Sequence, residues 1–131
     1  MKFIKGLIGA ACFGKGIMKF QQGRFEDAAR LLEKSFRLDP EDDRIEFCNA
    51  YLGRSYLALG RTDDALDQMS RAYDRFEKER PEIENEYEQR EFQKFIRQYI
   101  KVLNKVGQTE RAHEVEAGSQ GLMADMFKKA E

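Results

Sequence analysis

The stretches GRFEDA at 23–28, GRTDDA at 60–65 and GQTERA at 107–112 share one pattern. In each stretch a glycine is followed five residues later by an alanine, and an acidic residue lies between them. A helix that ends at a left-handed glycine, followed by a tight turn and a second helix, produces such a pattern. The alanine then stands where two helices must approach closely. Because the pattern occurs three times, we predict a chain built from repeated pairs of helices.

Apolar residues outside these stretches recur at the spacing of a helix. One stripe runs through Ala65, Met69, Tyr73 and Phe76, and a longer one comprises Ile83, Tyr87, Phe92, Phe95, Ile96, Tyr99, Val102, Leu103 and Val106. No part of the chain alternates, over a useful length, with the period of two residues that a strand requires. The sequence therefore predicts an all-α protein.

The composition fits one helical domain and excludes several classes of protein. Of the 131 residues, 41% are apolar and 36% are charged, and 23 Lys and Arg nearly balance 24 Asp and Glu. A net charge of −1 offers no general footprint for nucleic acid, and no stretch reaches the ~18 apolar residues that a membrane span needs. Cys12 and Cys48 stand alone in apolar surroundings, which is typical of reduced thiols in a cytoplasmic protein. A single intramolecular disulfide is the alternative.

The repeated pattern resembles the tetratricopeptide repeat, whose consensus has a Leu-Gly pair, an aromatic residue, an alanine and a late proline. The middle copy matches best, at Leu52, Gly53, Tyr56, Gly60, Ala65, Met69 and Ala72. The resemblance implies a right-handed α-solenoid of about three helix pairs in one domain, 1–131. We expect the repeats at approximately 9–42, 46–80 and 82–118, followed by a capping helix at 119–131. Partner binding or self-association by that last helix is an alternative.

The spacing of the copies departs from the 34-residue period of the family. Gly23 and Gly60 are 37 residues apart, and Gly60 and Gly107 are 47 apart. We expect the extra residues to lengthen two consecutive helices, one running to about Glu79 and the next starting at Pro81. This predicts a charged hairpin tip at 75–91 that projects ~7 Å beyond the normal repeat edge. A longer loop is the alternative.

Residues with catalytic or metal-binding chemistry are sparse. The single histidine, His113, has at most one carboxylate, Glu116, at helical spacing, which is too few ligands for a metal site. No phosphate-binding glycine loop, nucleophile elbow or Cys–His arrangement occurs. The sequence therefore predicts a protein that is not an enzyme, with no catalytic residues, no metal and no cofactor.

The resemblance also implies a concave groove lined by the first helix of each pair. Carried over to this sequence, the groove residues are Phe13, Ile17, Phe20, Phe47, Tyr51, Arg54, Lys94, Arg97, Gln98, Lys101 and Lys105. One end of such a groove is apolar and aromatic, and the other is basic. We therefore expect an adaptor that binds a protein or peptide segment with apolar anchors and an acidic end, and that does not bind nucleic acid.

The first 25 residues carry a charge bias that the net charge conceals. They contain five basic residues and no acidic one; the five are Lys2, Lys5, Lys15, Lys19 and Arg24. Such a bias suggests an alternative function, a membrane-surface or self-assembling scaffold that uses residues 1–20 and forms a homo-oligomer. The opening MKFIKGLIGAACFGKG also has the rough order of a secretory signal, so export or membrane association is the alternative to a cytoplasmic location.

Overall fold

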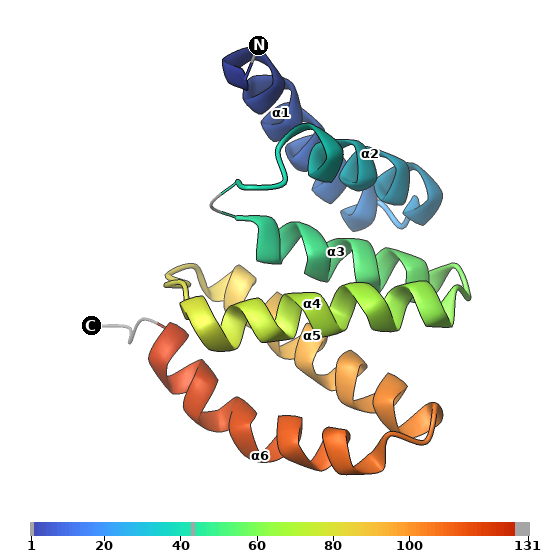
Figure 1. The fold of residues 1–131 in the computed structure, drawn as a ribbon, viewed down its shortest axis with the longest axis vertical. Helices are drawn as coiled ribbons and strands as arrows, with labels where there is room; N and C mark the ends of the chain where they lie inside the picture. The colour runs from blue at the N-terminus through green and yellow to red at the C-terminus, as the bar shows by residue number, and fades with distance from the viewer. Residues whose placement is uncertain (1, 43, 128–131) are drawn as a thin grey trace. The chain divides into compact units, whose positions relative to one another are not determined.

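The computed structural model describes residues 2–42 and 44–127, and helices dominate this part of the chain (Figure 1). The helices are α1 (Lys2–Gln21), α2 (Phe25–Leu38), α3 (Ile45–Ala58), α4 (Thr62–Glu79), α5 (Glu86–Lys105) and α6 (Thr109–Met126). The described residues contain no strand, only one isolated parallel bridge between Ile83 and Phe127. The prediction of an all-α protein made of helix pairs is confirmed. None of the helices described is long and apolar enough to cross a bilayer.

The chain divides into two compact units, Met1–Ala72 and Tyr73–Glu131. Unit 1 contains α1, α2, α3 and most of α4, whereas unit 2 contains the end of α4 together with α5 and α6. In Figure 1, α1 and α2 run antiparallel beside each other, and so do α5 and α6. Each unit is therefore built from hairpins of helices.

The three repeated glycines end their helices in the predicted way. Gly23, Gly60 and Gly107 have φ values of 75°, 77° and 84°, in the left-handed region that a glycine adopts without a Cβ clash. The residue after each glycine donates its N–H to the carbonyl five residues earlier, over distances of 2.8–2.9 Å: Arg24 to Lys19, Arg61 to Tyr56, and Gln108 to Leu103. These bonds satisfy carbonyls that a helix end leaves without a partner. The same turn therefore closes α1, α3 and α5.

Close approach between helices in unit 1 depends on small residues. A Cβ added to Gly16 of α1 would lie 2.8 Å from Leu32 Cγ of α2. Likewise, a Cβ on Gly53 of α3 would lie 2.5 Å from Met69 Cγ of α4. Buried alanines such as Ala28 complete these contacts, as expected from the repeat pattern.

Unit 2 has an aromatic core. The ring of Phe76 at the end of α4 lies edge-on to Phe92 of α5, with ring centres 4.9 Å apart. Phe95 packs between Phe76 at 5.7 Å and Tyr99 at 6.1 Å. The inner face of α6 is also apolar and buried, through Ala112, Val115, Leu122 and Met126.

The connection between α4 and α5 differs from the prediction. As expected, α4 ends at Glu79, and α4 and α5 are long, with 18 and 20 residues against 14 each in α2 and α3. However, Pro81 does not start a helix, because α5 begins at Glu86 after the cap Asn85, whose Oδ1 accepts the N–H of Tyr87 at 2.7 Å.

The reason is the burial of Ile83. Its N–H donates to the carbonyl of Met126 at the end of α6, at 2.8 Å, and its side chain is fully buried. Ile83 also forms an isolated parallel bridge with Phe127, and this extended backbone is incompatible with a helix that starts at Pro81. Within the predicted tip at 75–91, the segment 80–85 is therefore not helical, and Ile83 anchors it to α6.

The last helix is also organised differently from the prediction. Residues 119–126 continue α6 without a break, so no separate capping helix begins at 119, and 128–131 lie outside the described residues. Gly118 and Gly121 do not interrupt α6 because Ser119, Leu122 and Met126 bury the same face as Ala112 and Val115. This burial outweighs the cost of about 1 kcal/mol for each glycine within a helix.

Candidate functional site

The predicted groove residues of unit 1 form a packed aromatic cluster between α1 and α3. Phe20 lies edge-on to Tyr51 at 5.2 Å and to Phe25 of α2 at 5.4 Å. The guanidinium of Arg54 lies over the ring of Phe20 at 4.7 Å and near that of Tyr51 at 5.8 Å. Cation–π contacts of this kind hold Arg54 in place, and its side chain is largely buried.

The remaining predicted residues of unit 1 share the same helix faces. On α1, Phe13 is buried and Ile17 is half-buried; the guanidinium of Arg44 covers the Phe13 ring at 5.1 Å. On α3, Phe47 is half-buried and lies one helical turn before Tyr51. Most of this aromatic surface is therefore packed within unit 1. Ile17, Phe20 and Phe47 remain partly exposed.

The predicted groove residues of unit 2 lie along one face of α5. At about 100° per residue, Lys94, Arg97, Gln98, Lys101 and Lys105 fall within an arc of about 100°. Gln98 is half-buried and the four basic side chains are exposed. From 92 to 109 the sequence contains these four cations and no acidic residue. We call Lys94, Arg97, Lys101 and Lys105 the α5 basic face.

Most of the charge on the α5 basic face is not neutralised by the part of the chain that the structure describes. Lys94 pairs with Glu91, with Nζ and Oε2 3.1 Å apart. Within residues 2–42 and 44–127, no carboxylate pairs with Arg97, Lys101 or Lys105. The electrostatic potential at this face is therefore positive, and its four basic side chains are exposed to solvent.

Arg90 extends the same line of basic residues and was not among the predicted site residues. It lies four residues before Lys94, is exposed, and makes only a long ion pair with Glu86 at 3.9 Å. Its spacing from Lys94 is the signal that identifies it. The acidic residues around it in the sequence conceal that it shares a helix face with the lysines.

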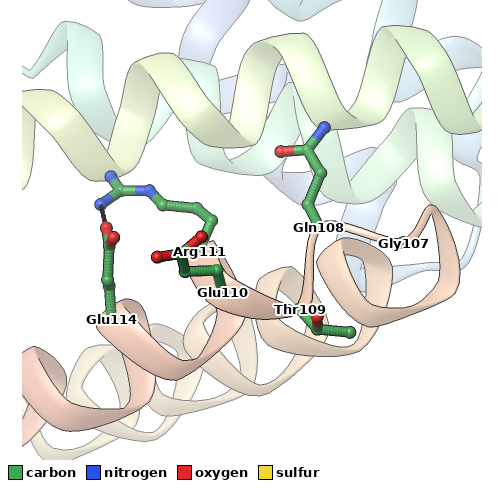
Figure 2. Close-up of a pocket in the computed structure, with 6 residues that line it drawn as sticks. All are labelled: Gly107, Gln108, Thr109, Glu110, Arg111 and Glu114. Atoms are coloured by element: carbon green, nitrogen blue, oxygen red, sulfur yellow. Dashed lines mark hydrogen bonds and ion pairs between the residues drawn. The ribbon is translucent and has the colours of Figure 1, made fainter.

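A shallow depression of about 420 Å³ lies at the turn between α5 and α6 (Figure 2). It is lined by Gly107, Gln108, Thr109, Glu110, Arg111 and Glu114. Arg111 points toward Glu114, 3.1 Å away, and also pairs with Asp74 of α4 at 3.2 Å. It lies 5.4 Å from the centre of the Tyr73 ring as well. With its charge satisfied by these carboxylates, Arg111 ties α6 to α4 and is not available to a ligand of the depression.

The titratable groups of the described residues include no cluster suited to a metal ion. No group of three or more His, Cys, Asp or Glu residues among them is placed to hold a metal ion. His113 is exposed on α6. The thiol of Cys48 is buried and donates to the carbonyl of Leu32 at 3.4 Å, and burial raises its pKa to about 12. Such a thiol is protonated at neutral pH and is a poor nucleophile.

The comparison with family models agrees with the helix pairs. A model described as "Tetratricopeptide repeat" matches residues 10–78, which is more than half of the chain and covers most of α1 to α4. No significant match to a curated protein or to a solved structure was found. Outside the matched range, α5 and α6 repeat the same turn at Gly107. The chain belongs to the tetratricopeptide repeat family.

Proposed function

We propose that the protein is a non-catalytic adaptor that binds a peptide or protein segment, with the α5 basic face of unit 2 as the surface for an acidic stretch. Tetratricopeptide repeats generally mediate protein–protein interactions. The observation that carries the proposal is the α5 basic face, where Arg97, Lys101 and Lys105 have no carboxylate partner in the described part of the chain.

These cations do not serve the fold. Arg97, Lys101 and Lys105 are spaced four residues apart, and like charges at this spacing destabilise a helix by about 0.2–0.5 kcal/mol per pair. Their side chains are exposed, so they contribute little packing. A ligand that brings negative charge would account for exposed cations that cost stability at these positions.

The geometry favours an extended acidic segment. Four residues of helix rise about 6 Å, and alternate residues of an extended chain are about 6.6 Å apart. Acidic residues at alternate positions of a bound segment would therefore face Arg97, Lys101 and Lys105 in turn. Arg97 provides a planar group for bidentate binding of one carboxylate, and the remaining charges would speed association and set direction.

Partly exposed side chains of unit 1 offer a separate, apolar candidate surface. Ile17 and Phe20 of α1 and Phe47 of α3 are half-buried, so each offers part of its surface to an apolar anchor. Arg54 is already held over Phe20, so we assign it the role of orienting this ring rather than of gripping a carboxylate. Because Phe20 packs against Tyr51 and Phe25, it is held in one orientation before a partner arrives.

The double variant Arg97→Glu/Lys101→Glu tests the proposal. The probe is an array of synthetic peptides that differ in their number of Asp and Glu residues, with affinities then measured by fluorescence anisotropy. We expect the native protein to prefer acidic peptides and the variant to bind them about tenfold or more weakly.

The matched control is Arg75→Glu/Lys78→Glu, which makes the same charge change at exposed basic residues of α4. It should retain the preference for acidic peptides. If the folded Arg97→Glu/Lys101→Glu protein binds these peptides as tightly as the control does, the α5 basic face is not the binding surface.

A further inference from the structure

The N-terminal half of α1 exposes large apolar side chains. Phe3 is 77% exposed, Ile4 48%, Leu7 58% and Ile8 43%. At about 100° per residue they lie within an arc of about 140°, with the small residues Ala10 and Ala11 continuing the same side. We call Phe3, Ile4, Leu7 and Ile8 the α1 apolar face.

The polarity of α1 is the reverse of an ordinary helix at the surface of a protein, which turns its large apolar residues toward the core. The side of α1 that packs on α2 contains Gly9, Cys12 and Gly16. The hydroxyl of Ser35 in α2 donates to the carbonyl of Gly9 at 2.8 Å, so the two backbones are in close contact. In the N-terminal half of α1 the small residues therefore serve the contact with α2, and the α1 apolar face is left exposed, whereas further along the helix Phe13 is buried.

The charges around this face are of one sign. Lys2, Lys5, Lys15 and Lys19 lie on α1, and no acidic residue occurs before Glu26. None of these lysines pairs with a carboxylate among the residues that the structure describes. The carboxylate of Asp39 lies beside Gly6 and its Cβ beside Gly9, away from the α1 apolar face.

We propose that α1 binds to the surface of a bilayer that contains anionic lipid, with Phe3, Ile4, Leu7 and Ile8 inserted at the boundary of the acyl chains. A helix with one apolar side and flanking lysines lies in the plane of such an interface, and each lysine near an anionic surface adds to the attraction. The alternative occupant is a second copy of the chain. A twofold contact between two α1 apolar faces would bring two sets of lysines together, and their repulsion would oppose the dimer, whereas anionic lipid attracts them. This binding is independent of the α5 basic face.

Flotation of the full chain with vesicles tests the inference. The probes are vesicles of phosphatidylcholine alone and vesicles of phosphatidylcholine with about one-third phosphatidylserine. We expect flotation with the anionic vesicles at low salt, and at least a tenfold weaker partition to the neutral ones. Phe3→Glu/Leu7→Glu and Lys5→Glu/Lys15→Glu should each reduce partition about tenfold or more.

Matched controls separate insertion from a general change of charge. Leu59→Glu/Val106→Glu replaces two other exposed apolar residues, and Arg75→Glu/Lys78→Glu reverses two other exposed basic residues. Both should float like the native protein.

A second measurement uses the absence of tryptophan from the sequence. The only tryptophan of a Leu7→Trp protein should shift its emission to the blue when anionic vesicles are added. That of a Leu59→Trp protein, at the turn after α3, should not shift.

Absence of flotation with both kinds of vesicle overturns the inference, and so does an unshifted Leu7→Trp emission. Sedimentation equilibrium tests the competing occupant, a second copy of the chain. A dimer that Phe3→Glu/Leu7→Glu abolishes, in a protein that does not float, assigns the α1 apolar face to self-association instead.

Discussion

α1 and α5 are both first helices of a pair, and both contain 20 residues, yet they divide their side chains in opposite ways. α5 buries Phe92, Phe95 and Tyr99 and exposes a row of cations. α1 buries Gly9 and Gly16 and exposes large apolar residues together with lysines. Position in the repeat therefore does not determine what a helix offers to solvent. The α5 basic face suits an acidic segment, and the α1 apolar face suits an anionic lipid surface.

The largest expected difference is between one buried and one exposed phenylalanine of these helices. Phe95→Ala should lower the free energy of unfolding by about 3–5 kcal/mol, because it removes a ring packed between Phe76 and Tyr99. Phe3→Ala should change it by less than about 0.5 kcal/mol. Urea unfolding followed by circular dichroism measures both. Similar losses at the two positions would mean that the α1 apolar face is packed inside the folded protein.

The next effect tests which side of α1 needs small residues. Gly16→Ala should destabilise by about 1–3 kcal/mol, because its Cβ would meet Leu32 at 2.8 Å. Gly14→Ala should stabilise by about 0.5–1 kcal/mol, because nothing lies within 4 Å and alanine favours helix. Thermal unfolding of the two proteins compares them. A gain in stability from Gly16→Ala would contradict the close packing of α1 on α2.

A dependence on alkaline pH should distinguish the two units. Burial raises the pKa of Cys48 in unit 1 from 9.0 to about 12, and that of Tyr73 in unit 2 from 10.0 to about 12. Folding therefore favours the protonated forms, and their stabilising contribution is present at low pH and is lost as the pH rises. The loss begins near pH 9 for the thiol and near pH 10 for the tyrosine, with at most about 1.4 kcal/mol lost per pH unit for each group.

The Cys48→Ala protein is the control for this dependence. Its urea midpoint should fall less steeply than that of the native protein between pH 9 and 10 and also above pH 10, because the thiol of the folded native protein keeps its proton up to about pH 12. Equal slopes in the lower interval would show that the thiol is not buried in solution.

The smallest effect concerns the charges of α5. In the native protein Lys101 lies four residues from both Arg97 and Lys105 and repels both; in the Lys101→Glu protein both pairs become attractive. Each is worth about 0.2–0.5 kcal/mol, so this variant should be slightly more stable than the native protein although it binds acidic peptides more weakly. Thermal unfolding and fluorescence anisotropy on the same sample measure both changes. A loss of stability would indicate that Lys101 has a structural role.

The local features of the fold were the most predictable. The three turn glycines, the end of α4 at Glu79 and the exposed side chains of Arg97, Lys101 and Lys105 follow from spacing and residue type alone. Arg90 was overlooked because neighbouring acids hide it in the linear sequence, although it lies on the same helix face. Prediction was weaker for Phe20, Tyr51 and Arg54, because the resemblance assigned them to a groove and the structure packs them largely against one another.

The sequence by itself determined that the chain folds into helix pairs, because helical periodicity and a left-handed glycine are properties of neighbouring residues. Only the tertiary structure decided that Pro81 starts no helix, since Ile83 gains a buried site and a hydrogen bond on α6, more than 40 residues later in the chain. In the same way, contact with α2 decided which side of α1 faces solvent. A helix with small residues on one side and large ones on the other is apolar on both, so only the close approach of its neighbour selects the buried side.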